Sequence, residues 1–263
     1  MQPLRAWPAA ARARIAGVLT DIDDTLTTEG VVGEEVVRAL QSLADAGLHV
    51  IPITGRPVGW SEPFARAWPV DAIVAENGAV ALTHRSPAEP LRKLYMQDAP
   101  LRAANFARMQ QVARRIVREV PGATISRDSG GRETDIAIDH GEFAHLPQEA
   151  IDRVVALMRA EGMNATVSSI HVNGWYGGHN KLAGARWVVR ELLGRELDAE
   201  LDRWVYVGDS TNDVLMFEHF PHGIGVANIR RFEQQLAFKP RYVTEGERGA
   251  GFAEVARAIL DAR

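Results

Sequence analysis

The sequence of 263 residues contains no cysteine. This absence excludes disulfides, thiolate metal ligands and cysteine nucleophiles. No run reaches the ~18 uninterrupted apolar residues of a membrane span, and 30 Lys and Arg against 34 Asp and Glu give a net charge of −4. A chain without a basic excess offers no attractive field for nucleic acid. We therefore expect neither a membrane nor a nucleic-acid partner.

The N-terminal segment is the only place where a signal peptide could lie. Arg12 and Arg14 interrupt its apolar stretch, so we expect no signal peptide and interpret residues 1–13 as a short tail. By default we expect a cytoplasmic location, which fits the lack of cysteine. No pattern in the sequence indicates an oligomeric state.

Hydrophobic residues make up 46% of the chain and charged residues 24%, the balance of a soluble globular protein. The length suits either one large domain or one domain with a smaller companion. The first part predicts apolar strands at 15–19, 48–53 and 72–75, with helices between them at 34–46 and 58–68. This alternation indicates an α/β fold with a doubly wound, Rossmann-like parallel sheet covered by helices on both faces.

The pattern changes after residue 84. Residues 83–105 contain three prolines and no clean period, and residues 173–178 are rich in glycine, so both segments are interpreted as crossings between folding units. Between them the sequence predicts helices at 106–119 and 148–161 and paired strands at 124–127, 134–138, 165–168 and 171–175. We expect a core formed by 1–84 and 179–263 and an inserted α+β unit at 85–178. The α/β pattern resumes with a helix at 181–193 and a strand at 205–207.

Polar residues follow the predicted core strands in four places, where parallel sheets bind ligands. The four pieces are Asp21-Ile22-Asp23-Asp24-Thr25-Leu26, Ile53-Thr54-Gly55-Arg56, Lys181 at a helix start, and Gly208-Asp209-Ser210-Thr211-Asn212-Asp213. Closely spaced carboxylates suit a hard cation. A hydroxyl, backbone N–H groups and a lysine at a helix N-terminus suit an anion.

Each piece also has an ordinary structural explanation. The acidic run could be a solvated turn, and the Thr-Gly pair could be a simple loop. Lys181 could face solvent, and Asp213 could only cap the helix that follows it. Arg56 could be a surface arginine.

Taken together, the four pieces resemble the motifs of the haloacid dehalogenase-like (HAD) superfamily of phosphotransferases. Residues 21–26 are similar to its D-x-D-x-T-L nucleophile motif, and residues 208–213 to its acidic fourth motif. Thr54 is similar to the hydroxyl of the second motif and Lys181 to the lysine of the third. Asp24, where many relatives have glycine, and Thr211 depart from the pattern.

The insertion between Thr54 and Lys181 resembles the α/β cap of HAD subfamily IIB. This branch includes Cof-type sugar phosphatases, phosphomannomutase, sucrose-phosphate phosphatase and mannosyl-3-phosphoglycerate phosphatase. Glu76-Asn77-Gly78-Ala79 and Gly208-Asp209-Ser210 are most similar to the last of these. The resemblance therefore implies a HAD core with an inserted cap.

The resemblance also implies roles for the core residues. Asp21 would attack phosphorus, and Asp23 would act as general acid and then base. Mg²⁺ would be held by Asp21, the backbone carbonyl of Asp23, Asp209 and Asp213, the last directly or through water. Thr54 and Lys181 would bind the transferring phosphoryl group.

The function implied is a Mg²⁺-dependent phosphatase for a small, sugar-like phosphate monoester, with an aspartyl-phosphate intermediate. Two alternatives stay open, a phosphosugar mutase and a non-catalytic protein that binds a phosphorylated metabolite. The arginines of the predicted helix at 106–119 are interpreted as a solvated face. Candidates for contacts to the substrate are Gly55, Arg56, Asn77, Arg127, Arg132, Ser168, His171 and Asn212.

Overall fold

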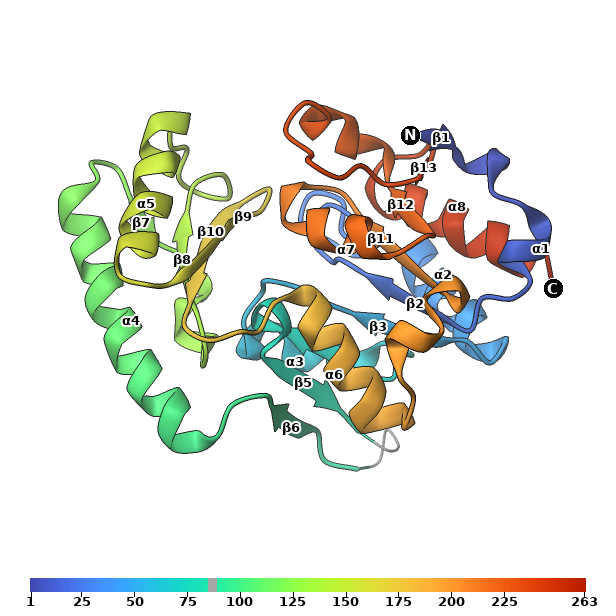
Figure 1. Ribbon diagram of the computed structural model, residues 1–263, viewed down its shortest axis with the longest axis horizontal. Coiled ribbons are helices and arrows are strands. Elements are labelled where there is room, and N and C mark those ends of the chain that lie inside the picture. The colour runs from blue at the N-terminus through green and yellow to red at the C-terminus, as the bar shows by residue number, and fades with distance from the viewer. Residues whose placement is uncertain (85–88) are drawn as a thin grey trace.

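Six parallel strands form the central sheet of the computed structural model, which describes residues 1–84 and 89–263 (Figure 1). The strands run in the order β1-β13-β12-β11-β2-β3 across the sheet. Their bounds are Gln2–Pro3 (β1), Gly17–Thr20 (β2), His49–Pro52 (β3), Trp204–Gly208 (β11), Gly223–Gly225 (β12) and Tyr242–Val243 (β13). The predicted doubly wound parallel sheet is confirmed.

Two hydrophobic clusters cover the two faces of this sheet. One contains the buried sides of α2 (Glu34–Asp45), α3 (Val58–Ala67) and α8 (Arg248–Leu260). The other contains those of α6 (Lys181–Leu193) and α7 (Val214–His219). Residues in β2 and β11 are buried along their whole length, as expected for central strands of a sheet with helices on both faces.

The N-terminal residues are part of the fold, so the prediction of a short tail was wrong. Strand β1 pairs in parallel with β13, and a 3-10 turn (Leu4–Ala6) and a short helix α1 (Ala9–Arg12) follow it. Trp7 is only 1% exposed, and its ring lies against those of His222 and Tyr242. Burial of this one indole ring fixes the segment to the sheet edge.

A three-stranded antiparallel sheet extends the core beyond β3. It consists of β4 (Ile73–Ala75), β5 (Val80–Thr83) and β6 (Arg92–Tyr95). A parallel bridge between Ile53 and Val74 joins it to the central sheet. The segment 83–105, interpreted as a crossing, also contains regular structure, because β6 pairs with β5 and the next helix begins at Ala99. The division of the chain into 1–84, 85–178 and 179–263 stays a prediction, and residue 85 and Pro87 lie outside the described residues.

The second lobe contains a four-stranded antiparallel sheet in the order β7-β8-β10-β9, with two helices packed on it (Figure 1). The strands are Thr124–Ile125 (β7), Ile136–Asp139 (β8), Asn164–Val167 (β9) and His171–Trp175 (β10), and the helices are Ala99–Glu119 (α4) and Gln148–Ala160 (α5). Helix α4 begins earlier than predicted because Asp98 caps it, accepting the N–H of Leu101 at 2.8 Å.

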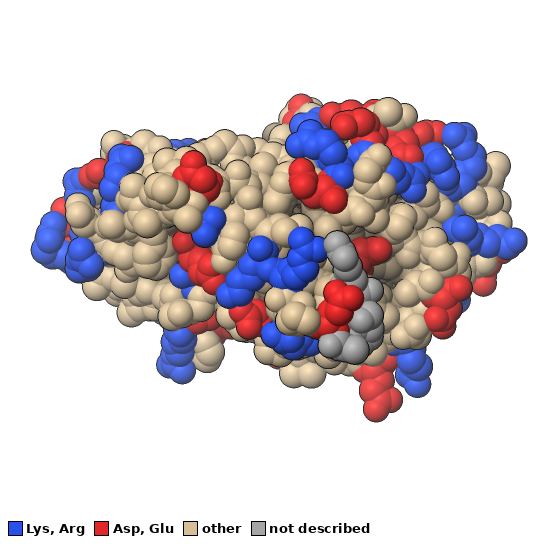
Figure 2. All heavy atoms as spheres, turned by 90° about the horizontal axis from the view of Figure 1, so that it is seen from below, with Lys and Arg blue, Asp and Glu red and all other residues tan. Residues whose placement is uncertain are grey.

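Among the described residues, no helix has the length and apolar character needed to cross a membrane. Acidic and basic side chains are interspersed on the face drawn in Figure 2, in keeping with the small net charge.

Helix α6 passes unusually close to the 3-10 turn η2 (Glu76–Gly78). A Cβ at Gly184 would lie 2.5 Å from the Cα of Gly78, and this backbone neighbour cannot move aside as a flexible side chain can. We predict that Gly184→Ala lowers the free energy of unfolding by roughly 1–3 kcal/mol. Urea denaturation would measure this loss.

The matched control is Gly178→Ala, at an exposed position just before α6. A Cβ at Gly178 meets nothing within 4 Å, so this change should alter the free energy of unfolding by at most a few tenths of a kcal/mol. Equal stability of the two variants would contradict the close packing of α6.

Candidate active site

Asp21 lies directly after β2, at the carboxyl edge of the parallel sheet. Its side chain is 5% exposed, and its Oδ1 lies 2.9 Å from Nζ of Lys181. The N–H of Ile22 donates to the same oxygen at 2.8 Å. One carboxylate oxygen is thus held by a charge and a backbone donor.

Asp209 and Asp213 come to the same place from the end of β11. Carboxylate oxygens of Asp21, Asp209 and Asp213 all lie within 4.8 Å of one another. Oδ2 of Asp213 accepts the N–H groups of Asp209 at 2.9 Å and Ser210 at 3.2 Å. Asp213 therefore stabilises the turn before α7, which is the purely structural role considered for it from the sequence. It also faces the other two carboxylates of the acidic cluster.

Lys181 is the one ammonium within this cluster of described residues. It begins α6, whose first turn is capped by Asn180, and its Nζ lies 2.7 Å from Oδ1 of Asp213. The hydroxyl of Tyr206 donates to that same oxygen. Lys181 is buried, so the alternative of a solvent-facing lysine is excluded.

The negative charge of the three carboxylates exceeds the positive charge of Lys181. Burial raises the pKa of Asp21 to about 7, Lys181 opposes this shift, and the charges of Asp213 and Asp23 add to it. Burial, with Asp21 and Asp213 next, raises the pKa of Asp209 well above its usual range. Such a site stabilises an added cation.

Thr54 and Gly55 follow β3 and bring the second predicted motif to the same edge. Thr54 is fully buried, and its Oγ1 accepts the N–H of Arg56 at 3.0 Å. The carbonyl of Gly55 accepts from Nη1 of Arg132 at 3.0 Å and from Nδ2 of Asn173 at 3.3 Å. The loop therefore lies at the contact between the two lobes.

Asp23 forms an ion pair with Arg56. Nε of Arg56 donates to the two oxygens of Asp23 at 2.9 and 3.1 Å. The same guanidinium reaches Glu142 at 2.9 Å and Asp128 at 3.4 Å. The sequence analysis missed Asp128 and Glu142, which lie 72 and 86 residues from Arg56 and belong to no recognisable motif.

A narrow cavity of about 10 Å³ lies between the lobes at this place. Seven predicted site residues line it, together with three that were not predicted. The predicted ones are Asp21, Asp23, Gly55, Arg56, Ser168, His171 and Asn212, and the others are Ser169, Ile170 and Asn173.

Three candidate substrate residues lie outside this lining. The guanidinium of Arg127 stacks over the ring of Phe143 at 3.9 Å. Arg132 is buried and donates to Asp135 at 2.7 Å, and Asn77 donates to the same carboxylate at 3.3 Å. In this structure all three side chains contact other protein groups.

Two buried carboxylates fasten the lobes together and were also missed. Glu76 of η2 accepts the N–H of Val58 at 3.0 Å and the N–H of Thr134, from the other lobe, at 2.5 Å. Asp135 accepts from Asn173 at 3.2 Å as well as from Arg132 and Asn77. Burial raises the pKa of both groups, that of Asp135 to about 7.

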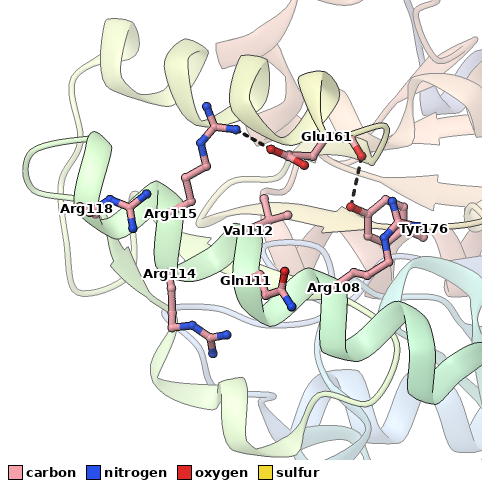
Figure 3. A pocket seen from close by; sticks show the side chains of 8 residues that line it. All are labelled: Arg108, Gln111, Val112, Arg114, Arg115, Arg118, Glu161 and Tyr176. Carbon is pink, nitrogen blue, oxygen red and sulfur yellow. Dashed lines mark hydrogen bonds and ion pairs between the residues drawn. The ribbon is translucent and has the colours of Figure 1, made fainter.

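The arginines of α4 line a separate hollow on the second lobe (Figure 3). Arg115 pairs with Glu119 and Glu161, and the guanidinium of Arg108 lies 4.1 Å from the centroid of the Tyr176 ring. These contacts support the interpretation of a solvated, partly paired helix face.

Comparison with known proteins adds independent evidence. A sequence model of the haloacid dehalogenase-like hydrolase family matches residues 18–113. A phosphoglycolate phosphatase of Methanothermobacter thermautotrophicus is 25% identical over 92% of this chain and 98% of its own. Another phosphoglycolate phosphatase, from Pyrobaculum neutrophilum, is 29% identical over 92% of this chain and 95% of its own.

Two solved structures share the fold. A protein of Thermoplasma acidophilum matches with a TM-score of 0.70 and 16% identity, over 94% of this chain and 98% of its own. The sucrose-phosphatase of Synechocystis, solved with sucrose and phosphate, matches with a TM-score of 0.65 and 16% identity, over 93% and 97%. The family model and the phosphatase relatives show that this chain is similar to the haloacid dehalogenase-like hydrolases and support a phosphoric monoester hydrolase, and the two solved structures show the shared fold.

Proposed function

We propose that this phosphatase uses Mg²⁺ to hydrolyse a small, sugar-like phosphate monoester through an aspartyl-phosphate on Asp21. The observation that carries the proposal is the buried group of Asp21, Asp209 and Asp213 around the ammonium of Lys181. A phosphate dianion is repelled by a carboxylate nucleophile, so positive charge must be supplied at this point. The lysine alone leaves an excess of negative charge.

The donor set fits Mg²⁺, which prefers oxygen ligands and keeps some of its waters. Asp21, Asp209 and the backbone carbonyl of Asp23 would hold the ion. Both oxygens of Asp213 already accept from protein donors, which favours a contact through water. When bound, the ion would neutralise charge on the phosphoryl oxygens and orient them.

The protein's own residues would then carry out the separate steps of the reaction. A carboxylate oxygen of Asp21 attacks phosphorus in line with the departing oxygen. Lys181 and the hydroxyl of Thr54 bind the transferring oxygens. Asp23, two residues after the nucleophile and on the wall of the same cavity, protonates the leaving oxygen and then takes a proton from the attacking water.

Hydroxyl and amide groups around the cavity favour a hydroxylated leaving group. Ser168, Ser169, Asn173 and Asn212 can each donate to and accept from a sugar hydroxyl.

Phosphoglycolate is a second candidate substrate, because relatives that match over 92% of this chain carry that name. Its carboxylate would need a cation, yet Arg56 and His171 both already contact Glu142. We therefore favour an uncharged leaving group. A panel of sugar phosphates, glycerol phosphates and phosphoglycolate, assayed for phosphate release with Mg²⁺, decides between them. Turnover that needs a bisphosphate activator and returns phosphate to the sugar would instead indicate the mutase.

Removal of the metal should abolish activity. We predict that excess chelator stops phosphate release and that added Mg²⁺ restores it, because Lys181 alone cannot offset three buried carboxylates. Full turnover by metal-free enzyme would exclude the proposed role of the ion.

Stabilisation by Mg²⁺ should increase with pH. The raised pKa of Asp21 means that its proton adds stability at low pH, and that this contribution is lost as the pH rises from about 4 through about 7. At low pH the cation must displace this proton, whereas at high pH it binds an ionised group. We predict a larger rise of Tm on adding Mg²⁺ at about pH 8 than at about pH 5.5, measured against chelator at each pH. Equal shifts would contradict the buried acidic site.

The nucleophile and the acid–base group should respond differently to substitution. We predict that Asp21→Asn abolishes turnover and the acid-stable phosphoenzyme. Asp23→Asn should lower kcat by about 10²–10⁴-fold for alkyl esters but spare phosphorylation by an aryl phosphate, whose leaving group needs little protonation. Wild-type rates in Asp21→Asn would exclude the mechanism.

A further inference from the structure

Arg56 joins Asp23 to the opposite lobe. Its side chain is 7% exposed, and it holds Asp23 through the Nε contacts described above and through Nη2 at 2.9 Å. The guanidinium also lies 5.0 Å from the centroid of the Trp60 ring. An aromatic face and a bidentate carboxylate together fix the plane of the guanidinium. Asp23 remains 15% exposed and lines the cavity, so its carboxylate stays reachable.

The partner in the second lobe, Glu142, is itself firmly placed. It lies in the turn after β8, where the buried carboxylate of Asp139 accepts four successive N–H groups at 2.9–3.2 Å, those of residues 141–144. Nε2 of His171 lies 3.1 Å from the second oxygen of Glu142. The hydrogen bond from His171 lowers the pKa of Glu142, burial opposes this, and Arg56 adds to the lowering. Glu142 is therefore an ionised group on a rigid turn.

We infer that Arg56 is a positioning residue for Asp23 and that Glu142 fixes Arg56, so that the acid–base carboxylate is correctly oriented when the two lobes are in contact. The inference rests on the proposed acid–base role of Asp23. Without Glu142, one edge of the Arg56 guanidinium loses its charged partner. The guanidinium that orients Asp23 can then rotate. Proton transfer depends steeply on such geometry.

Leaving-group chemistry separates this role from a purely structural one. An alkyl ester expels a strongly basic alkoxide and needs the proton from Asp23, whereas p-nitrophenyl phosphate expels a weak base and scarcely needs it. A misplaced Asp23 should therefore slow enzyme phosphorylation by the alkyl ester selectively, whereas hydrolysis of the aspartyl-phosphate, which also uses Asp23, is common to both esters. A loss of folding or of phosphoryl binding would slow both esters alike.

The experiment compares KM and the single-turnover rate constant of enzyme phosphorylation for the best alkyl phosphate of the panel and for p-nitrophenyl phosphate, both with Mg²⁺. We expect Arg56→Lys, which keeps the charge but loses the planar guanidinium, to lower this rate constant for the alkyl ester by about 10–100-fold. Glu142→Gln should lower it by a smaller factor in the same direction. The aryl ester should change less than about threefold in both variants.

Matched controls come from an ion pair on the outer surface of the second lobe. Arg115→Lys and Glu161→Gln make the same changes in a pair remote from Asp23 and should leave both esters at wild-type rates. In the Asp23→Asn background, Arg56→Lys should cause no further loss on the alkyl ester, because the two residues act as one unit.

Three outcomes overturn the inference. These are equal losses on both esters, a further loss in the Asp23→Asn background, and an effect on KM alone, which would make Arg56 a direct substrate contact. If the Arg56→Lys variant does not fold, the Glu142→Gln variant tests the inference through the same ratio of the rates for the alkyl and the aryl ester. A wild-type enzyme that hydrolyses neither ester with Mg²⁺ refutes the proposed function itself, a result distinct from the other three.

Discussion

The bridge that Lys181 makes between Asp21 and Asp213 is the interaction on which the rest of the site depends. Three buried carboxylates cannot be gathered at one point unless positive charge accompanies them, and removing one partner from a buried pair costs several kcal/mol. The bridge in turn requires that α6 begin beside β11 and β2. Close approach of the backbones at Gly184 and Gly78 permits this, since neither position carries a Cβ. The packing of one helix against one turn thus determines where the ammonium lies.

The same turn also fastens the second lobe. Glu76 and its neighbour Asn77 have left-handed backbone conformations, with φ of 49° and 56°, which cost free energy in residues other than glycine. In return the carboxylate of Glu76 accepts backbone donors from both lobes, and Asn77 reaches Asp135. Buried polar groups whose hydrogen bonds are completed only by the other lobe favour one relative placement of the two lobes. The cavity therefore has fixed walls on both sides, one carrying Asp21 and Asp23 and the other carrying His171.

The sequence predicted the parallel sheet and placed Asp21, Thr54, Asp209 and Asp213 at one edge of it, because the carboxyl ends of adjacent parallel strands meet there whatever the loop lengths. Lys181 was placed with them only by the resemblance to a family motif, since it begins α6 after a strand of the second lobe. The sequence could not predict Glu142, Asp128 or Asp135. These carboxylates lie in a segment whose contacts with the core depend on how two lobes dock, and no local period or spacing encodes that. The two-residue strand β1 was missed for a similar reason, since its place at the sheet edge depends on burial of Trp7 against Tyr242.

Asp24 shows how a departure from a family pattern can be accommodated. Its φ of 54° explains why glycine suits this position, because an ordinary side chain costs about 1–2 kcal/mol there. Here the carboxylate of Asp24 lies 3.1 Å from Nε of Arg248, and its carbonyl accepts from Nδ2 of Asn228 at 3.0 Å. The same Nδ2 donates to Asp209 at 3.1 Å. The strained loop after β2 is therefore tied to the acidic residue after β11, so the contacts that offset the strain at Asp24 also hold together the two halves of the carboxylate cluster.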